Sequence, residues 1–313
     1  MVSLNGHYWT IAPRLRHAFR PSPAPPAKPW RTRVPDPDFG SVQITGLLRE
    51  KPESDSVLIV IHGLGGSCES NYALRAARAA EAAGLSCLRL NLRGADRSGE
   101  DLYHAGLTDD LRAAIRSPQI RKYRRVLVLG YSLGGHVALR YASEGSDTSV
   151  AAVAAVCSPL NLGVCQANLD APATWLYRTY LLTTLKSLYR TVAAKRPLST
   201  PPEAIDTIHR LREFDDLAVA PRHHFANAGD YHAKASVWPL LPRLEVPALL
   251  VASRNDPMVP LASVEPWLGQ ASPALSVRWQ DSGGHVGFPP DLDLGEPSPR
   301  GLEPQVLHWL VTR

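Results

Sequence analysis

The sequence predicts an α/β fold in which a mainly parallel sheet is covered by helices on both faces. Short β-rich runs alternate with longer segments whose apolar residues recur at helical spacing. Most of the β-rich runs are apolar throughout, as strands buried on both faces are. With 313 residues the chain is long enough to bury a core without disulfides or metal ions.

The elements follow one another along the chain in a regular order. Seven runs are predicted as strands, at 41–48, 57–61, 85–90, 125–130, 150–156, 247–252 and 274–279. Five segments are predicted as helices, at 70–83, 108–117, 133–143, 263–270 and 303–312. This alternation predicts a core formed by residues 41–158 and 245–313.

Residues 1–40 differ from the rest in composition. They contain eight of the 28 prolines, which predicts an extended arm ahead of the fold, and no catalytic residue is expected there. Residues 1–35 hold six basic residues and no acidic one. A solvated tail is one interpretation, and weak contact with anionic lipid head groups is the other.

One interval of about 90 residues, between the strands that end at 156 and begin at 247, breaks the alternation. We predict a helical cap at 159–244, with helices at 173–194 and 203–211. Its Tyr and Leu residues could roof a pocket or simply pack on the core.

Composition also excludes several classes of protein. The whole chain carries +5 and residues 1–35 carry +6, so the body carries −1, and a nucleic-acid partner is not expected. Four cysteines without CxxC spacing predict neither a disulfide scaffold nor a metal site, and no cofactor is expected. No signal peptide or membrane-spanning run is found, which predicts a cytoplasmic protein; the oligomeric state stays open.

A candidate nucleophile follows the run at 125–130. The sequence Gly130-Tyr131-Ser132-Leu133-Gly134 lies where a strand turns directly into a helix. Such a sharp turn exposes the central serine, and the flanking glycines let the strand and the helix approach each other.

A serine hydroxyl needs a base to remove its proton and an acid to orient that base. Asp256 and His285 each come just after a predicted strand, and the carboxyl ends of parallel strands share one edge of the sheet. Taken alone, each could be an ordinary loop residue. The order Ser, Asp, His with each residue at a strand end favours a catalytic triad.

Acyl transfer also needs N–H donors for the developing oxyanion. The N–H of Leu133 is one candidate. The N–H of Leu64 is the second, in a loop where His62, Gly63 and Gly65 support it. This loop lacks the lysine and the spacing of a phosphate-binding loop.

These motifs together resemble the α/β-hydrolases, in the branch of YheT-like and ABHD1/2/3-type hydrolases. The resemblance covers nearly everything after residue 40. Further motifs that carry it are Asn91-Leu92-Arg93-Gly94, the segments 103–111 and 212–216, Asn255-Asp256-Pro257, and Gly283-Gly284-His285-Val286-Gly287-Phe288.

The resemblance implies an α/β-hydrolase fold, the triad Ser132, Asp256 and His285, and hydrolysis of carboxylic esters on acyl or lipid-like substrates. We therefore predict a serine hydrolase that works through an acyl-enzyme intermediate, and the apolar cap favours small-molecule esters with an apolar acyl group. Acyl transfer or cofactor-free perhydrolysis on the same triad, or a non-catalytic scaffold that binds a lipid or partner, are the alternatives. Arg93, His104 and Asp109 are predicted to form a buried polar network behind the catalytic loops. Many relatives have Glu where this chain has Gly65.

Overall fold

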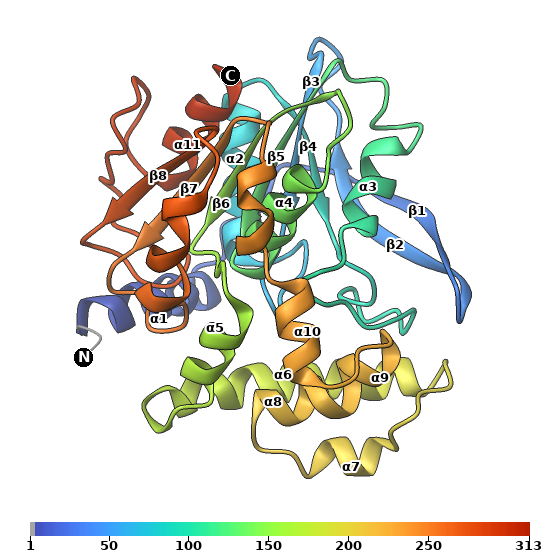
Figure 1. Cartoon of the computed structure of the whole chain (residues 1–313). Helices are drawn as coiled ribbons and strands as arrows, with labels where there is room; N and C mark the ends of the chain where they lie inside the picture. Colours follow the sequence, from blue (N-terminus) through green and yellow to red (C-terminus); the bar gives the residue numbers. More distant parts are fainter. Residues whose placement is uncertain (1–3) are drawn as a thin grey trace.

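Eight strands form one sheet in the computed structural model, which describes residues 4–313 (Figure 1). The strands are β1 (Lys28–Asp36), β2 (Gly40–Arg49), β3 (Ser56–Ile61), β4 (Ser86–Leu90), β5 (Arg125–Tyr131), β6 (Val150–Val156), β7 (Ala248–Ser253) and β8 (Leu275–Gln280). Their order across the sheet is β1-β2-β4-β3-β5-β6-β7-β8. Every neighbouring pair from β4 to β8 is parallel, while β2 pairs antiparallel with both β1 and β4. The predicted mainly parallel sheet is confirmed, and all seven predicted strands are present.

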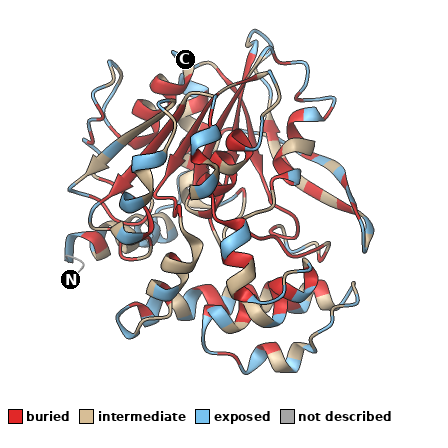
Figure 2. Cartoon of the chain, viewed as in Figure 1, coloured by how far each residue is buried: buried red, intermediate tan, exposed pale blue. Residues whose placement is uncertain are grey.

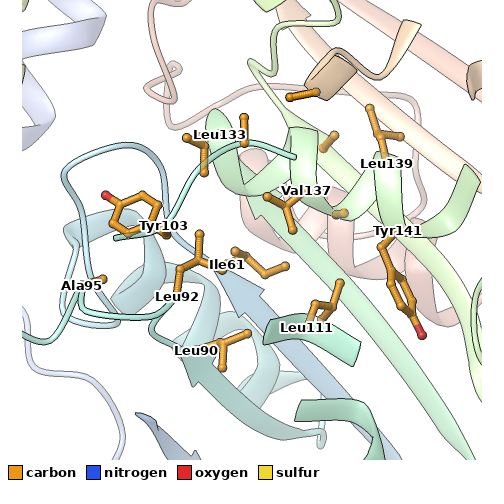
Figure 3. Packing of buried hydrophobic residues seen from close by; sticks show 14 of the residues in the cluster. Ile61, Leu90, Leu92, Ala95, Tyr103, Leu111, Leu133, Val137, Leu139 and Tyr141 are labelled. Atoms are coloured by element: carbon orange, nitrogen blue, oxygen red, sulfur yellow. The ribbon is translucent and has the colours of Figure 1, made fainter. Parts of the chain in front are cut away.

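Helices cover both faces of this sheet. They are α2 (Asn71–Ala82) and α11 (Leu302–Val311) on one face, and α3 (Asp109–Arg116) and α4 (Leu133–Ser143) on the other. Alternate residues of β3 enter the two cores, because successive side chains of a strand point to opposite faces. Leu58 and Val60 pack with α2 and α11, whereas Ile59 and Ile61 pack with α3 and α4. Figure 2 shows the central strands β3 to β7 as mostly buried, and Figure 3 shows part of the core between the sheet and α3 and α4.

The interval between β6 and β7 is helical and lies below the sheet in Figure 1. Its elements are α5 (Leu162–Leu169), η1 (Pro172–Thr174), α6 (Trp175–Ala193), α7 (Pro202–Asp206), α8 (Leu211–Phe214), η2 (Asp215–Val219), α9 (Ala220–Arg222), α10 (Ala228–Ala235) and η3 (Trp238–Arg243). Throughout, we call residues 159–244 the cap.

Two of the predicted helices differ from the structure. The helix predicted at 203–211 is two elements, because the Glu213 carboxylate accepts the N–H groups of His209 and Arg210 and so starts a new helix at Leu211. The segment predicted at 263–270 contains two 3₁₀ turns, η4 (Leu261–Ser263) and η5 (Glu265–Gln270), instead of an α-helix. Pro266 lacks the N–H that a continuous helix through this segment would use.

The N-terminal segment is the largest departure from the prediction. Residues 1–3 lie outside the described part of the chain. In the rest of the segment α1 (Leu4–Phe19) is a helix and β1 belongs to the sheet, so the prediction of an extended arm ahead of the fold is wrong. The proline-rich stretch between them is irregular, as expected. Pro29 and Pro35 are tolerated in β1 because it is an edge strand, paired only with β2.

Two further observations concern the chain as a whole. All four cysteines are free and buried. Within residues 4–313, no helix combines the length and the hydrophobicity that crossing a bilayer requires.

Candidate active site

Ser132 occupies the turn between β5 and α4 in a strained backbone conformation, which the packing of the turn holds in place. Its φ is 53° and its ψ −118°, a region that costs a residue with a side chain on the order of 1–3 kcal/mol. Tight packing permits this turn: a Cβ on Gly130 would lie 2.2 Å from the Gly134 carbonyl oxygen, and one on Gly134 would lie 2.4 Å from that of Ile61. The expected strand–turn–helix around Ser132 is therefore present, with the side chain half-buried at the N-terminus of α4.

Asp256 and His285 lie on the loops after β7 and β8 and contact each other. His285 Nδ1 lies 2.9 Å from Asp256 Oδ2. The other carboxylate oxygen of Asp256 accepts the N–H groups of Met258 and Val259, at 2.8 and 2.9 Å. Both side chains are buried, and these bonds hold the carboxylate in one orientation. Among residues 4–313, His285 Nε2 has no hydrogen-bond partner, so it is the ring nitrogen available to act as a base.

A pocket of about 920 Å³ lies between the turn that carries Ser132 and the loop that carries His285. Ser132 and His285 both line it, as do Leu64 and Leu133. Within the described residues no hydrogen bond joins the Ser132 hydroxyl to His285. The structure therefore brings Ser132, His285 and the two predicted N–H donors to one cavity, while Asp256 contacts His285 without lining it.

The loop after β3 lines this cavity, and one of its backbone N–H groups has no acceptor among the described residues. Gly63 N–H donates to the Tyr72 hydroxyl at 3.0 Å and Gly65 N–H to the Tyr103 hydroxyl at 2.7 Å. Between them, Leu64 N–H has no acceptor in the described part of the chain. The loop passes beside the serine, since a Cβ on Gly63 would lie 3.1 Å from Ser132 Cβ.

His62 fixes the base of this loop. Its Nδ1 lies 2.8 Å from the Gly63 carbonyl oxygen, and its Nε2 accepts the N–H of Leu92 at 3.2 Å. One donor and one acceptor fit the neutral ring. Burial lowers the pKa of His62 to about 4, so the ring stays neutral near pH 7.

Helix α1 also contributes to the site, although no catalytic residue was expected in residues 1–40. His285 N–H donates to Thr10 Oγ1 at 2.8 Å, and the Thr10 hydroxyl donates to the Gly6 carbonyl at 2.7 Å. A Cβ on Gly284 would lie 2.1 Å from the Gly6 carbonyl oxygen, so the backbones of α1 and the His285 loop are in direct contact. Several residues of α1 line the pocket.

A buried ionic cluster lies behind these loops, but its members differ from the predicted ones. Arg93 donates to Asp110 and Asp101, at 2.8 to 3.1 Å. Asp101 also accepts from Arg222 of the cap at 2.7 Å. Asp109 is exposed instead, so its predicted membership is wrong. His104 is buried next to His223, with ring centroids 4.4 Å apart, and burial lowers its pKa.

The cluster also includes Asp36 of β1. Burial alone would raise the pKa of Asp36, but hydrogen bonds from Phe39 N–H and from Arg222 outweigh it, and the pKa is lowered. The cluster thereby ties the edge of the sheet to the cap.

Sequence reasoning missed three hydroxyl groups at the site. Tyr103 falls in a motif to which no chemical step could be assigned, and Tyr72 in an ordinary amphipathic helix. Thr10 carries no local signal, because its partner is 275 positions away. Thr10 can accept the His285 N–H only because α1 packs against the His285 loop.

Comparisons with known proteins agree with this architecture. The model of the alpha/beta hydrolase family matches residues 58–293. YheT of Escherichia coli, described as an esterase, is 32% identical over 98% of this chain and 91% of its own length. Human ABHD3, described as a phospholipase, is 27% identical over 74% of this chain, which spans 58% of that protein.

Solved structures share the fold at lower identity. An esterase of Pyrococcus furiosus superposes with a TM-score of 0.54 at 18% identity, over 83% of this chain and 85% of that one. With its mainly parallel sheet, its strand–serine–helix turn and these sequence matches, the chain belongs to the alpha/beta hydrolase family, in the branch of YheT and ABHD3.

Proposed function

We propose that this protein is a serine hydrolase that cleaves carboxylic esters through an acyl-enzyme intermediate, with Ser132, Asp256 and His285 as the catalytic triad. The support that carries most weight is the 2.9 Å pair of His285 Nδ1 and Asp256 Oδ2 beside a pocket that Ser132 also lines. The relatives described as an esterase and a phospholipase favour the same class of reaction.

The mechanism begins with attack of the Ser132 hydroxyl on the ester carbonyl carbon. His285 Nε2 accepts the hydroxyl proton, and Asp256 holds the ring so that Nδ1–H points to its carboxylate. Serine and base are often too far apart for a hydrogen bond in free enzymes and approach each other when substrate binds. His285 then gives the proton to the leaving alcohol, and water, activated by the same ring, releases the acid.

The negative charge of the tetrahedral intermediate falls on the former carbonyl oxygen. We assign its stabilisation to the N–H groups of Leu64 and Leu133. Leu133 N–H is at the N-terminus of α4, whose helix dipole also favours an anion. Losing one such donor typically costs about 10²–10³ in rate.

The walls of the pocket favour an ester with an apolar acyl group. From the cap, Leu176, Leu181 and Leu185 line it. Apolar surface placed against these side chains leaves water, which contributes about 25 cal/mol for each Å². Acyl chain length is the variable that a substrate series would determine.

A series of aryl esters of increasing acyl length, hydrolysed by wild type and by Ser132→Ala, tests the proposal. We expect Ser132→Ala to lose on the order of a millionfold in kcat, as loss of a triad nucleophile does elsewhere. Its thermal unfolding should change little. Activity within tenfold of wild type would remove Ser132 from the mechanism.

A further inference from the structure

Beyond ester hydrolysis, we propose that the outer faces of α1 and α6 form a surface that docks the protein on a lipid bilayer carrying negative charge, with the pocket opening at this surface. We call it the lipid-docking surface. Its large apolar side chains are Leu4, Tyr8, Leu15 and Phe19 of α1, and Trp175, Leu176 and Tyr180 of α6.

The first observation is how strongly exposed apolar side chains concentrate here. Among residues 4–313, eight large hydrophobic side chains are exposed, and all but Leu217 belong to this surface. Leu4 and Phe19 are 88% and 83% exposed. Contiguous apolar patches of this kind mark interaction sites, whereas a single exposed side chain needs no explanation.

The second observation is the arrangement along α1. Leu4, Tyr8, Leu15 and Phe19 are separated by four, seven and four positions. At 3.6 residues per turn, these spacings place them within roughly 60° of arc on one side of the helix. The opposite side holds Thr10, which faces the His285 loop. Helix α1 therefore has one face on the active site and an apolar stripe in solvent, and Figure 2 shows exposed positions along it.

The third observation is that the two helices form one continuous surface around the pocket. His7 Nδ1 lies 2.7 Å from the Tyr177 hydroxyl, and the Arg14 guanidinium lies 4.0 Å from the centre of the Tyr180 ring. Leu15, Leu176 and Tyr180 belong to the lipid-docking surface and also line the pocket. A lipid ester at this surface thus has a short apolar route to Ser132.

The positive charge of α1 and α6 favours an anionic bilayer over a second copy of the chain at this surface. Neither α1 nor α6 contains an Asp or Glu, while basic residues recur along both: Arg14, Arg16, Arg178 and Lys186, with Arg20 just after α1. Arg190 of α6 is paired with Asp206 and is not counted among them. A second copy docked here would bring like charges together. An anionic bilayer would accept both the apolar stripe and the arginines, as interfacial amphipathic helices do.

The test is co-sedimentation of the full chain with vesicles of phosphatidylcholine, with or without about a third phosphatidylglycerol. We expect wild type to bind the anionic vesicles at least tenfold more tightly than the neutral ones, with binding that weakens as salt rises. Leu4→Ser/Phe19→Ser should reduce the affinity at least tenfold. These positions are almost fully exposed, so the fold should persist, which thermal unfolding checks.

Two controls and one charge-removing variant make the result specific. Leu217→Ser, which removes the exposed side chain outside the surface, should bind as wild type does. Arg16→Gln/Arg20→Gln should bind anionic and neutral vesicles alike. Ser132→Ala should bind vesicles normally, so docking is measured apart from the proposed chemistry.

The proposal is overturned if wild type fails to bind anionic vesicles at low salt, or if Leu4→Ser/Phe19→Ser binds them as tightly as wild type. It is equally overturned if light scattering finds a dimer that Leu4→Ser/Phe19→Ser dissociates, because the surface would then be an interface between copies.

Discussion

Replacing Thr10 by valine removes the only side-chain acceptor of the His285 N–H in the described structure while keeping the shape of the residue. An N–H left without a partner costs about 1–3 kcal/mol. The His285 loop can avoid that cost by moving, which takes Nε2 out of line with Ser132. Since each 1.4 kcal/mol corresponds to a factor of ten in rate, kcat should fall about 5- to 150-fold with little change in KM.

Steady-state hydrolysis of a soluble aryl ester by Thr10→Val and Thr10→Ser measures this effect. Serine keeps the hydroxyl, so Thr10→Ser should recover kcat to within about twofold of wild type. Thermal unfolding of both variants shows whether the lost hydrogen bond lowers the stability of the fold or only kcat. If Thr10→Val keeps kcat within twofold while losing about 1 kcal/mol or more of stability, the loop is held in place by other contacts and the reasoning fails.

Two further predictions concern stability and protonation. Asp101→Ala removes one of the two carboxylates that Arg93 and Arg222 share, while Asp36 stays paired with both. The hydrogen bonds lost involve charged groups, so the free energy of unfolding in urea should fall by about 1.5–3 kcal/mol at pH 7, and a loss below about 0.5 kcal/mol would contradict the buried cluster. His62 is neutral in the folded protein, with a pKa of about 4, and has an ordinary pKa near 6.5 when unfolded. Its contribution to stability is therefore complete above pH 6.5 and is lost as the pH falls toward 4, at about 1.4 kcal/mol per pH unit. NMR titration of its ring protons checks this, and a folded-state pKa at or above 6.5 would be incompatible with it.

The parallel part of the fold is predictable from sequence because most of its strands are almost entirely apolar; β4 and β8 each also contain an internal arginine. A strand buried on both faces needs no partner-specific information to be identified. The site follows from the same pattern, since Ser132, Asp256 and His285 each come after a strand and parallel strands end at one edge.

The parts that were not predicted depend on tertiary contacts. Strand β1 contains two prolines and is stable only because β2 offers an edge. Helix α1 has an internal proline and few local signals, and it is held by the His285 loop and α6. Which of Asp109 and Asp110 faces inward depends on the phase of α3, where one position turns the side chain by about 100°.

The most direct test of the proposed chemistry is to locate the covalent intermediate. Wild type, Ser132→Ala and His285→Ala are treated with a fluorophosphonate, and intact mass and peptide mapping identify the modified residue. We expect one adduct per wild-type chain, on Ser132, with no labelling of Ser132→Ala and much slower labelling of His285→Ala. Ester hydrolysis by a wild-type protein that acquires no adduct, or acquires it on another residue, would contradict the account.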